Sequence, residues 1–406
     1  MPPLPRTAWL AIDLDALASN LRVLRALAGG VPVQPVVKAD AYGHGALPVA
    51  TALADAAADG LCVATFDEAL ELRDGGIELP ILVLYPIPVE VTAEAARRGI
   101  GVTAGDEVLL ARLVAAMARE ASSTASESLA VHLEIETGLG RGGFAPDAAV
   151  AAADRLRTAV GIRLASAWTH LQAAEDQAVT ARQLARFDDA VLRLRAAGHD
   201  LPRHTAASVG ILEGGVASLD GVRPGLAVYG LVPDELAGDT ASAARAAELR
   251  PVMSLRAQAV RVTDLSSGWG ISYGPTFVTA RPSRIATLPL GYGDGWPRSL
   301  SNRADALVRG RRAPIVGSVA MDAVMVDVTD VPGEPVSVDD EFVLIGRQGD
   351  LEIPVADLAG TRSTNAWEVV TAMAARLPRV YHAASGPLGL RTLVSGTGPR
   401  PRRTRA

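Results

Sequence analysis

A single cysteine, Cys62, stands among the 406 residues, so no internal disulfide can form and several thiolates cannot share a metal. No apolar run approaches a membrane span, and Met1–Leu14 lacks the basic and apolar regions of a signal peptide. The net charge of −6 offers no footprint for nucleic acid. These absences predict a cytoplasmic enzyme that has no metal, no nucleic-acid partner and no membrane partner.

Lysine is almost absent, because the 39 basic residues comprise 38 arginines and one lysine, Lys38. Arginine replaces lysine wherever only surface charge is needed. An amine can form a Schiff base or lose a proton near neutral pH, whereas a guanidinium cannot. Lys38 is therefore predicted to serve chemistry, and the alternative is a surface lysine that survived by chance.

Short apolar runs alternate with alanine- and leucine-rich helical stretches from residue 33 to residue 229. The predicted strands are Pro35–Ala39, Leu61–Thr65, Ile81–Tyr85, Gly101–Ala104, Val131–Glu136, Leu164–His170, His204–Ser208 and Gly225–Gly230. Helical periodicity lies between most of them, as in Asp67–Arg73 and Gln177–Ala197. Eight such units predict an α/β fold, a (β/α)₈ TIM-like barrel over residues 14–244.

After a polar linker, Asp234–Glu248, short strands follow one another between Gly, Pro and Asp turns. They are predicted at Met253–Val262, Arg284–Leu288, Ala306–Val308, Ala313–Val319, Ala323–Val328 and Glu341–Ile345, with one helix near Asn365–Arg376. The prediction is a mostly β C-terminal domain, residues 245–384, joined by an N-terminal strand over residues 6–13. The basic tail, residues 385–406, is predicted to be partly disordered.

Polar side chains fall where the predicted barrel strands end, which is the functional edge of a parallel barrel. Lys38 ends the first strand, His170 the sixth and Ser208 the seventh. Burial beside an apolar strand lowers the pKa of a lysine and favours imine chemistry. Arg223 precedes the eighth strand, where the backbone N–H groups of a turn suit a phosphate.

Ordered motifs from Lys38 to Tyr381 resemble those of the alanine racemases, which are pyridoxal 5'-phosphate enzymes with a barrel and a C-terminal β domain. In the barrel they are VVKADAYGHG (Val36–Gly45), TGLGRGG (Thr137–Gly143), WTHLQAAED (Trp168–Asp176) and VRPGLAVYG (Val222–Gly230). In the second domain they are ISYGPTF (Ile271–Phe277), LPLGYGDGW (Leu288–Trp296), APIVGSVAMD (Ala313–Asp322), TNAWEVV (Thr364–Val370) and LPRVY (Leu377–Tyr381).

The resemblance implies racemisation of alanine by two bases, Lys38 and Tyr273 of the partner subunit, in a homodimer with shared active sites. The cofactor-binding residues implied are Lys38, Tyr42, His170, Ser208, Arg223, Gly225, Leu226 and Trp367. The substrate-binding residues implied are Arg141, Met321 and Tyr292. Glu134 and Asp322 would orient their neighbours, and Met321 would also come from the partner.

The chain departs from its relatives at three positions. Glu134 stands where many relatives carry a carbamylated lysine, so its own carboxylate is expected to orient Arg141. Ala207 replaces a frequent asparagine, and Trp367 replaces a usual tyrosine whose hydroxyl reaches the phosphate. Other interpretations therefore stay open: racemisation of another amino acid such as serine, decarboxylation, or a cofactor-binding relative without activity.

Overall fold

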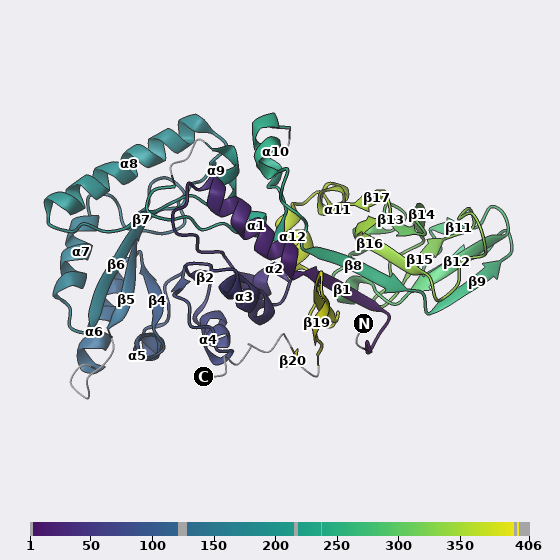
Figure 1. The fold of residues 1–406 in the computed structure, drawn as a ribbon, viewed down its shortest axis with the longest axis horizontal. Helices are drawn as coiled ribbons and strands as arrows, with labels where there is room; N and C mark the ends of the chain where they lie inside the picture. The colour runs from purple at the N-terminus through teal and green to yellow at the C-terminus, as the bar shows by residue number, and fades with distance from the viewer. Residues whose placement is uncertain (1–2, 121–127, 215–217, 237, 394–395, 398–406) are drawn as a thin grey trace.

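The computed structural model describes residues 3–120, 128–214, 218–236, 238–393 and 396–397. It has two β-rich parts, a parallel sheet covered by helices and a larger, mainly antiparallel sheet (Figure 1). The parallel sheet has six strands in the order β2-β3-β4-β5-β6-β7. Their bounds are Leu61–Val63, Ile81–Val83, Ile100–Ala104, Leu129–Glu134, Ile162–Trp168 and Arg203–His204.

Amphipathic helices follow these strands along the chain and cover the outside of the sheet (Figure 1). They are α4 (Phe66–Asp74), α5 (Thr92–Arg97), α6 (Glu107–Glu120), α7 (Ala149–Thr158), α8 (Gln177–Ala196) and α9 (Ser208–Glu213). Helix α8 buries Phe187, Val191 and Leu194 along one face, and the Asp176 carboxylate caps its first N–H groups. The strand–helix alternation predicted from the sequence is confirmed for these units.

The strands of the structure do not form the predicted closed barrel of eight strands. The segments on either side of the sheet touch through single parallel bridges, Val36 with Cys62 and Val33 with Val222. The predicted strands Pro35–Ala39 and Gly225–Gly230 are wrong, because the chain turns there into α2 (Lys38–Tyr42) and η2 (Leu226–Tyr229). Pro35 in the first segment and Pro224 just before the second have no N–H to donate to a ladder.

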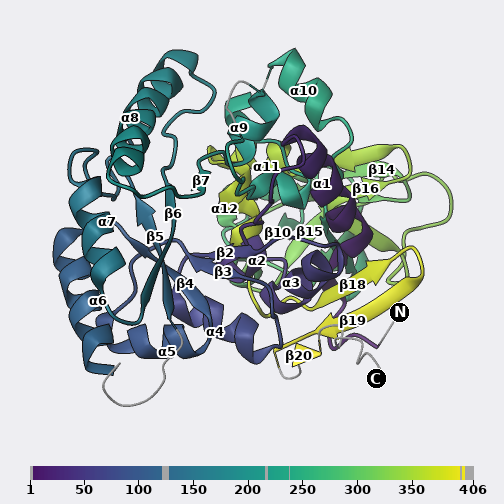
Figure 2. The ribbon, with the colours of Figure 1, turned by 60° about the vertical axis from the view of Figure 1, so that its left-hand side comes forward.

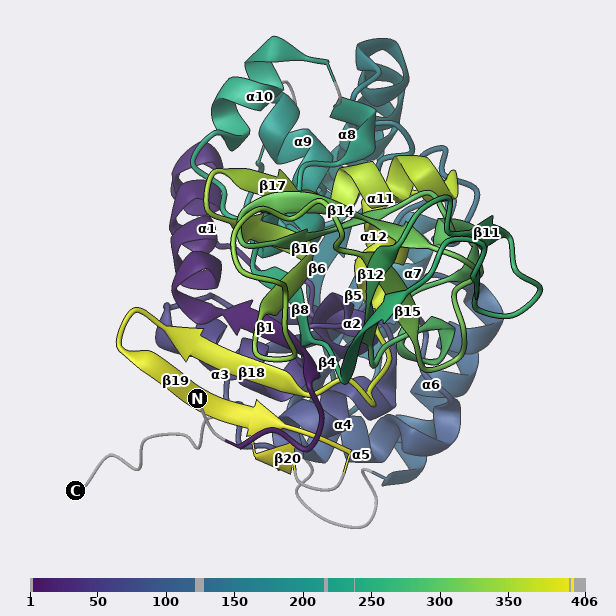
Figure 3. The ribbon, with the colours of Figure 1, turned by 90° about the vertical axis from the view of Figure 1, so that its right-hand side faces the viewer.

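The second sheet has twelve strands, and eleven follow the order β20-β19-β18-β1-β8-β16-β13-β14-β15-β12-β9. The N-terminal strand β1 (Ala8–Asp13) lies between β8 and β18, so both ends of the chain enter this sheet (Figure 3). The other strands are β8 (Met253–Gln258), β9 (Arg261–Leu265), β12 (Ser283–Leu288), β13 (Asp305–Val308), β14 (Arg311–Val316), β15 (Val324–Asp327), β16 (Glu341–Gln348), β17 (Leu351–Ile353) and β18 (Arg379–Ala383). Strands β10 (Gly270–Ile271) and β11 (Phe277–Val278) form a separate pair.

Helices α1 (Leu14–Leu27) and α10 (Thr240–Ala246) carry the chain between the two parts. The remaining helices are α3 (Ala46–Asp55), which precedes β2, and α11 (Val355–Arg362) and α12 (Ala366–Thr371), which follow β17. Helix α12 packs against α2, which brings the second part onto the edge of the parallel sheet (Figure 2). Helix α10 lies in the segment predicted as a linker, and α11 was not predicted. None of the helices in the described ranges is long and apolar enough to cross a membrane.

The C-terminal tail is partly built into the fold. Strand β19 (Gly386–Arg391) pairs with β18, and β20 (Gly396–Thr397) pairs with β19. Residues 386–391 of the tail predicted to be partly disordered therefore extend the large sheet. Residues 398–406 lie outside the described residues.

Candidate active site

A cavity of about 330 Å³ lies at the carboxyl ends of the parallel strands, against helix α12. Nine of the residues predicted to act on cofactor or substrate line it. These are Lys38, Tyr42, Arg141, His170, Ser208, Arg223, Gly225, Leu226 and Trp367. Residues spread over some 330 positions of sequence thus meet in one pocket, as expected for groups at the carboxyl ends of parallel strands.

Lys38 begins α2, which is a left-handed turn. Four consecutive residues after it have φ between 52° and 54°: Ala39, Asp40, Ala41 and Tyr42. Such a conformation costs about 1–2 kcal/mol for each non-glycine residue. Strain of this kind persists only where the surroundings enforce it, and it concentrates at functional sites.

Three contacts enforce the turn. The Glu68 carboxylate accepts a hydrogen bond from the Ala39 N–H at 2.7 Å. The Asp40 carboxylate accepts one from the Ala46 N–H at 2.7 Å and pairs with the Arg391 guanidinium, whose Nη1 lies 2.5 Å from Oδ1. Because Arg391 ends β19, the C-terminal strand holds the turn that presents Lys38.

We expect Arg391→Ala to lower the free energy of unfolding by about 1–2 kcal/mol and to weaken cofactor retention, because the strained turn loses its clamp. Urea unfolding and dialysis against cofactor-free buffer measure the two effects. Arg193→Ala is a matched control, since Arg193 makes an exposed pair with Asp189 within α8. That control should change stability by no more than about 0.5 kcal/mol. Equal effects from both variants would contradict the assignment.

The Lys38 amine is the nucleophile that the pocket offers. Burial lowers the pKa of Lys38 from its usual value, and the nearby positive charge of Arg141 lowers it further. A larger share of the amine is then unprotonated near neutral pH, which both imine formation and proton abstraction require.

The opposite side of the pocket has the shape of a phosphate cradle. The Ser208 hydroxyl accepts hydrogen bonds from the N–H groups of Gly225 at 2.9 Å and Ala227 at 3.2 Å. The N–H of Leu226, between them, finds no acceptor within the described ranges. A Cβ at position 225 would lie 2.6 Å from the Tyr42 hydroxyl, so only glycine leaves this space open. Hydroxyls and backbone N–H groups therefore converge on one small volume that suits an anion.

The guanidinium of Arg223 forms the buried floor of the pocket. One Nη donates to the Thr169 carbonyl at 2.9 Å, the other to Nδ1 of His204, and the Trp168 ring lies 4.8 Å below its carbon. Burial lowers the pKa of Arg223 to about 10, so the side chain stays charged at neutral pH. Burial and the neighbouring Arg223 lower the pKa of His170 to about 3, which keeps this imidazole neutral.

Arg141 is held between a carboxylate and an aromatic ring. Its Nη2 lies 3.7 Å from Oε1 of Glu134, an ion pair too long for a direct hydrogen bond. Its guanidinium carbon lies 5.4 Å from the centre of the Tyr85 ring. Burial raises the pKa of Glu134, and the positive charges of Arg141 and Arg223 oppose that rise.

Five predicted residues, Glu134 and four residues of the C-terminal part, do not line the pocket within one chain. The exposed fractions of Tyr273, Met321 and Tyr292 are 75%, 52% and 42%, on loops of the large sheet. Gly293 N–H donates to the Met321 carbonyl at 2.9 Å, which joins two of these loops. The Asp322 carboxylate pairs with Arg376 instead of facing the pocket.

Sequence reasoning missed three contributors. Tyr85 carried no motif signal, and Arg391 lay in the tail predicted to be partly disordered. His204 was interpreted as structural, although it contacts Arg223 directly. Because His204 begins the predicted strand His204–Ser208, the strand-end rule that singled out His170 gave no signal for it. No cluster of potential metal ligands occurs among the residues described.

Comparison with known proteins agrees with this geometry. Residues 12–233 match the family described as alanine racemase, N-terminal domain, and residues 252–381 match alanine racemase, C-terminal domain. The alanine racemase of Symbiobacterium thermophilum is 41% identical over 380 residues, which cover 93% of this chain and 97% of that protein. That of Thermobifida fusca is 40% identical over 379 residues, covering 92% and 97%.

Solved structures agree as well. The alanine racemase from Bacillus anthracis with bound L-Ala-P superposes with a TM-score of 0.86 at 31% identity, covering 97% of this chain and 99% of that one. The alanine racemase from D-cycloserine-producing Streptomyces lavendulae gives a TM-score of 0.82 at 35% identity, covering 94% and 98%. The chain therefore belongs to the alanine racemase family of pyridoxal 5'-phosphate-dependent isomerases.

Proposed function

We propose that this enzyme interconverts L- and D-alanine, with pyridoxal 5'-phosphate held on Lys38. The observation that carries the proposal is the convergence of the chain's only lysine, a phosphate cradle and two guanidinium groups on one cavity. The residues present fit the cofactor: Lys38 offers an amine of lowered pKa, and Ser208, Tyr42 and the Leu226 N–H offer donors to a phosphate. When bound, the cofactor withdraws electrons from the α-carbon of an amino acid and so acidifies its hydrogen.

Each remaining group has a task that its chemistry allows. Arg223 would lie beside the cofactor ring, and its permanent charge would disfavour protonation of the ring nitrogen. Arg141 binds the substrate carboxylate. The Glu134 carboxylate orients the Arg141 guanidinium and stabilises its positive charge. The Lys38 Nζ removes or returns the α-proton on one face. The Tyr273 Oη of the partner subunit does so on the other.

The second base implies a homodimer with shared active sites. The 75% exposure of Tyr273 and the 52% exposure of Met321 support this, because an active-site side chain left in solvent needs a partner to cover it. We further propose that the segments around residues 33–37 and 220–224 close the parallel sheet into the eight-unit barrel of the family. The domain bounds, 14–244 and 245–384, and the cytoplasmic location remain predictions.

Shared sites predict complementation between two inactive variants. Lys38→Ala and Tyr273→Phe each remove one base, so each homodimer should be inactive. A mixed dimer holds one site with both bases intact, and subunit exchange should restore up to about a quarter of the wild-type activity by random pairing. Activity is measured after mixing, and native mass spectrometry of mass-tagged chains confirms exchange. Verified mixed dimers without activity would contradict the shared site.

The function is tested by exchange of the α-hydrogen in D₂O. L-Alanine and D-alanine should both take up deuterium at the α-carbon, and chiral chromatography should show each forming the other. A panel of other amino acids, with serine foremost, tests the second candidate. Trp367 motivates that candidate, because its indole lines the pocket and differs in bulk and hydrogen bonding from the tyrosine usual in the family. No exchange on any amino acid by cofactor-loaded enzyme would refute racemisation.

A further inference from the structure

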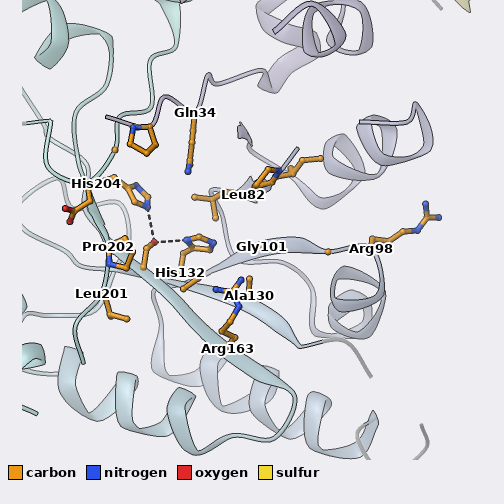
Figure 4. A pocket seen from close by; sticks show the side chains of 18 of the residues that line it. Gln34, Leu82, Arg98, Gly101, Ala130, His132, Arg163, Leu201, Pro202 and His204 are labelled. Atoms are coloured by element: carbon orange, nitrogen blue, oxygen red, sulfur yellow. Dashed lines mark hydrogen bonds between the residues drawn. The ribbon is translucent and has the colours of Figure 1, made fainter. Parts of the chain in front are cut away.

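A second cavity, of about 1320 Å³, opens at the amino ends of the parallel strands, opposite the active site. His132, Ser166 and His204 line it together (Figure 4). The Ser166 hydroxyl lies 2.6 Å from Nδ1 of His132 and 2.9 Å from Nε2 of His204. Nδ1 of His204 contacts Arg223, so a continuous row of hydrogen bonds joins the active-site guanidinium to the far cavity.

The direction of every hydrogen bond in this row is fixed from one end. A guanidinium only donates, so Nδ1 of His204 accepts and its proton sits on Nε2. That Nε2–H donates to the Ser166 oxygen, which leaves the Ser166 hydroxyl proton for Nδ1 of His132. His132 therefore carries its proton on Nε2, beside Gly101 at the cavity. A Cβ at position 101 would lie 2.9 Å from that Nε2, so glycine makes room for the ring edge.

The row supplies hydrogen bonds to a guanidinium that makes no direct ion pair among the described residues. Arg223 is only 3% exposed, yet the ion pairs found among the described residues do not include it. A buried charge is costly unless it is paired or hydrogen-bonded. Hydrogen bonds that all point the same way polarise one another, and here every donor points away from the guanidinium. The dipoles of two imidazoles and one hydroxyl thus face the positive charge with their negative ends.

We propose that His204, Ser166 and His132 form one outward-directed relay that positions Arg223 and stabilises its buried charge. His132 and Ser166 are positioning residues that act through His204 and touch neither cofactor nor substrate. Both imidazoles must stay neutral for the relay to keep its direction. Burial lowers the pKa of His132 to about 4 and that of His204 well below its usual value, which agrees with this requirement.

Nitrogen NMR of the ¹⁵N-histidine-labelled holoenzyme tests the direction of the relay. Long-range proton–nitrogen correlations should show His132 and His204 neutral and protonated on Nε2. His44 is an internal reference for the other tautomer, which is protonated on Nδ1. Its Nδ1 lies 2.9 Å and 3.0 Å from two carbonyl oxygens and must therefore donate. A proton on Nδ1 of either relay histidine would overturn the proposal.

Removing the central hydroxyl tests the positioning role. Ser166→Ala should release His132 into a mixture of tautomers and lower kcat about tenfold with KM nearly unchanged. Ser166→Thr restores a hydroxyl and should recover most of the loss. Thr92→Val is the matched control, since the buried Thr92 hydroxyl has no partner among the residues that the structure describes, and this variant should leave kcat and KM unchanged. Wild-type kcat in Ser166→Ala, or no recovery in Ser166→Thr, would overturn the proposal.

A second pair of variants covers the case in which Ser166→Ala does not fold. His132→Asn keeps an acceptor near the Nδ1 position, whereas His132→Phe keeps none, so the Phe variant should lose more activity. Equal losses would overturn the relay. The kinetic results rest on the proposed role of Arg223, but the tautomers do not. If the proposed function failed, the NMR pattern would therefore stay the same. This result differs from failure of the relay, which would change the NMR pattern.

Discussion

Lys38→Ala should lose at least about ten-thousandfold in racemisation rate, because the proposed mechanism gives this residue both the covalent attachment of the cofactor and the role of one of the two bases. No second lysine exists to replace it. Chiral chromatography of alanine measures the rate, and the absorbance of dialysed protein measures the attached cofactor.

Lys38→Arg is the matched control for this experiment. It keeps a positive charge at the strained turn but forms no imine, so it should be as inactive as the alanine variant. Borohydride reduction of the wild-type protein, followed by peptide mapping, should place the cofactor on Lys38. Activity in Lys38→Arg, or a label on any other residue, would show that Lys38 is not the residue that binds the cofactor.

Glu134→Gln should reduce kcat/KM for alanine by about a hundredfold while the cofactor stays bound. The substitution keeps the shape of the side chain and removes the charge that faces Arg141 across 3.7 Å. In the proposed function Arg141 binds the substrate carboxylate, whereas Lys38 and the cradle around Ser208 hold the cofactor. Binding of the cofactor should therefore change far less than turnover. Wild-type turnover in this variant would show that the carboxylate has no role.

The pH dependence follows from the sign of the Glu134 shift. Burial raises the pKa of Glu134, so this carboxylate becomes protonated at a higher pH than an ordinary glutamate. The protonated side chain no longer makes an ion pair with Arg141. The wild-type pH–rate profile should show this acid limb, and Glu134→Gln should lack it. The folded state binds this proton more tightly than the unfolded state, so the wild-type protein loses stability as pH rises through that interval. Glu134→Gln should then be at least as stable as wild type at pH 7, although it is less active.

Carbon dioxide tests the expectation that the Glu134 carboxylate takes the place of a carbamylated lysine. Turnover should not change when dissolved carbon dioxide is removed, because the carboxylate is built in. Glu134→Lys should be weakly active in degassed buffer and should recover activity with bicarbonate. Carbon-dioxide dependence of the wild-type enzyme would contradict the equivalence of the two carboxylates.

The sequence predicted the members of the pocket better than the path of the backbone around it. Lys38, His170 and Ser208 were placed by the rule that functional groups follow strand ends, and all three line the cavity. The left-handed turn after Lys38 could not be predicted in this way. Its residues KADAY carry no glycine, and the contacts that enforce the turn come from Glu68 and Arg391.

The same limit applies to two other segments. The apolar run Gly225–Gly230 has the composition of a buried strand, but tertiary packing turns it into η2 beneath the cradle. The tail has the composition of a disordered segment, yet β18 supplies an edge with which residues 386–391 can pair. The composition of a segment does not show which distant strand or loop it will pack against. Long-range pairing therefore overrides the local preference.

The clamp between Asp40 and Arg391 also fixes when the enzyme can become competent during its synthesis. The lysine turn leaves the ribosome early, but its ion-pair partner is translated about 350 residues later. The same delay applies to β1, which lies between two strands from the distal part of the chain. A nascent chain that already contains every strand of the parallel sheet therefore still lacks the clamp that sets its nucleophile, and it should bind cofactor poorly until the last strand has been added.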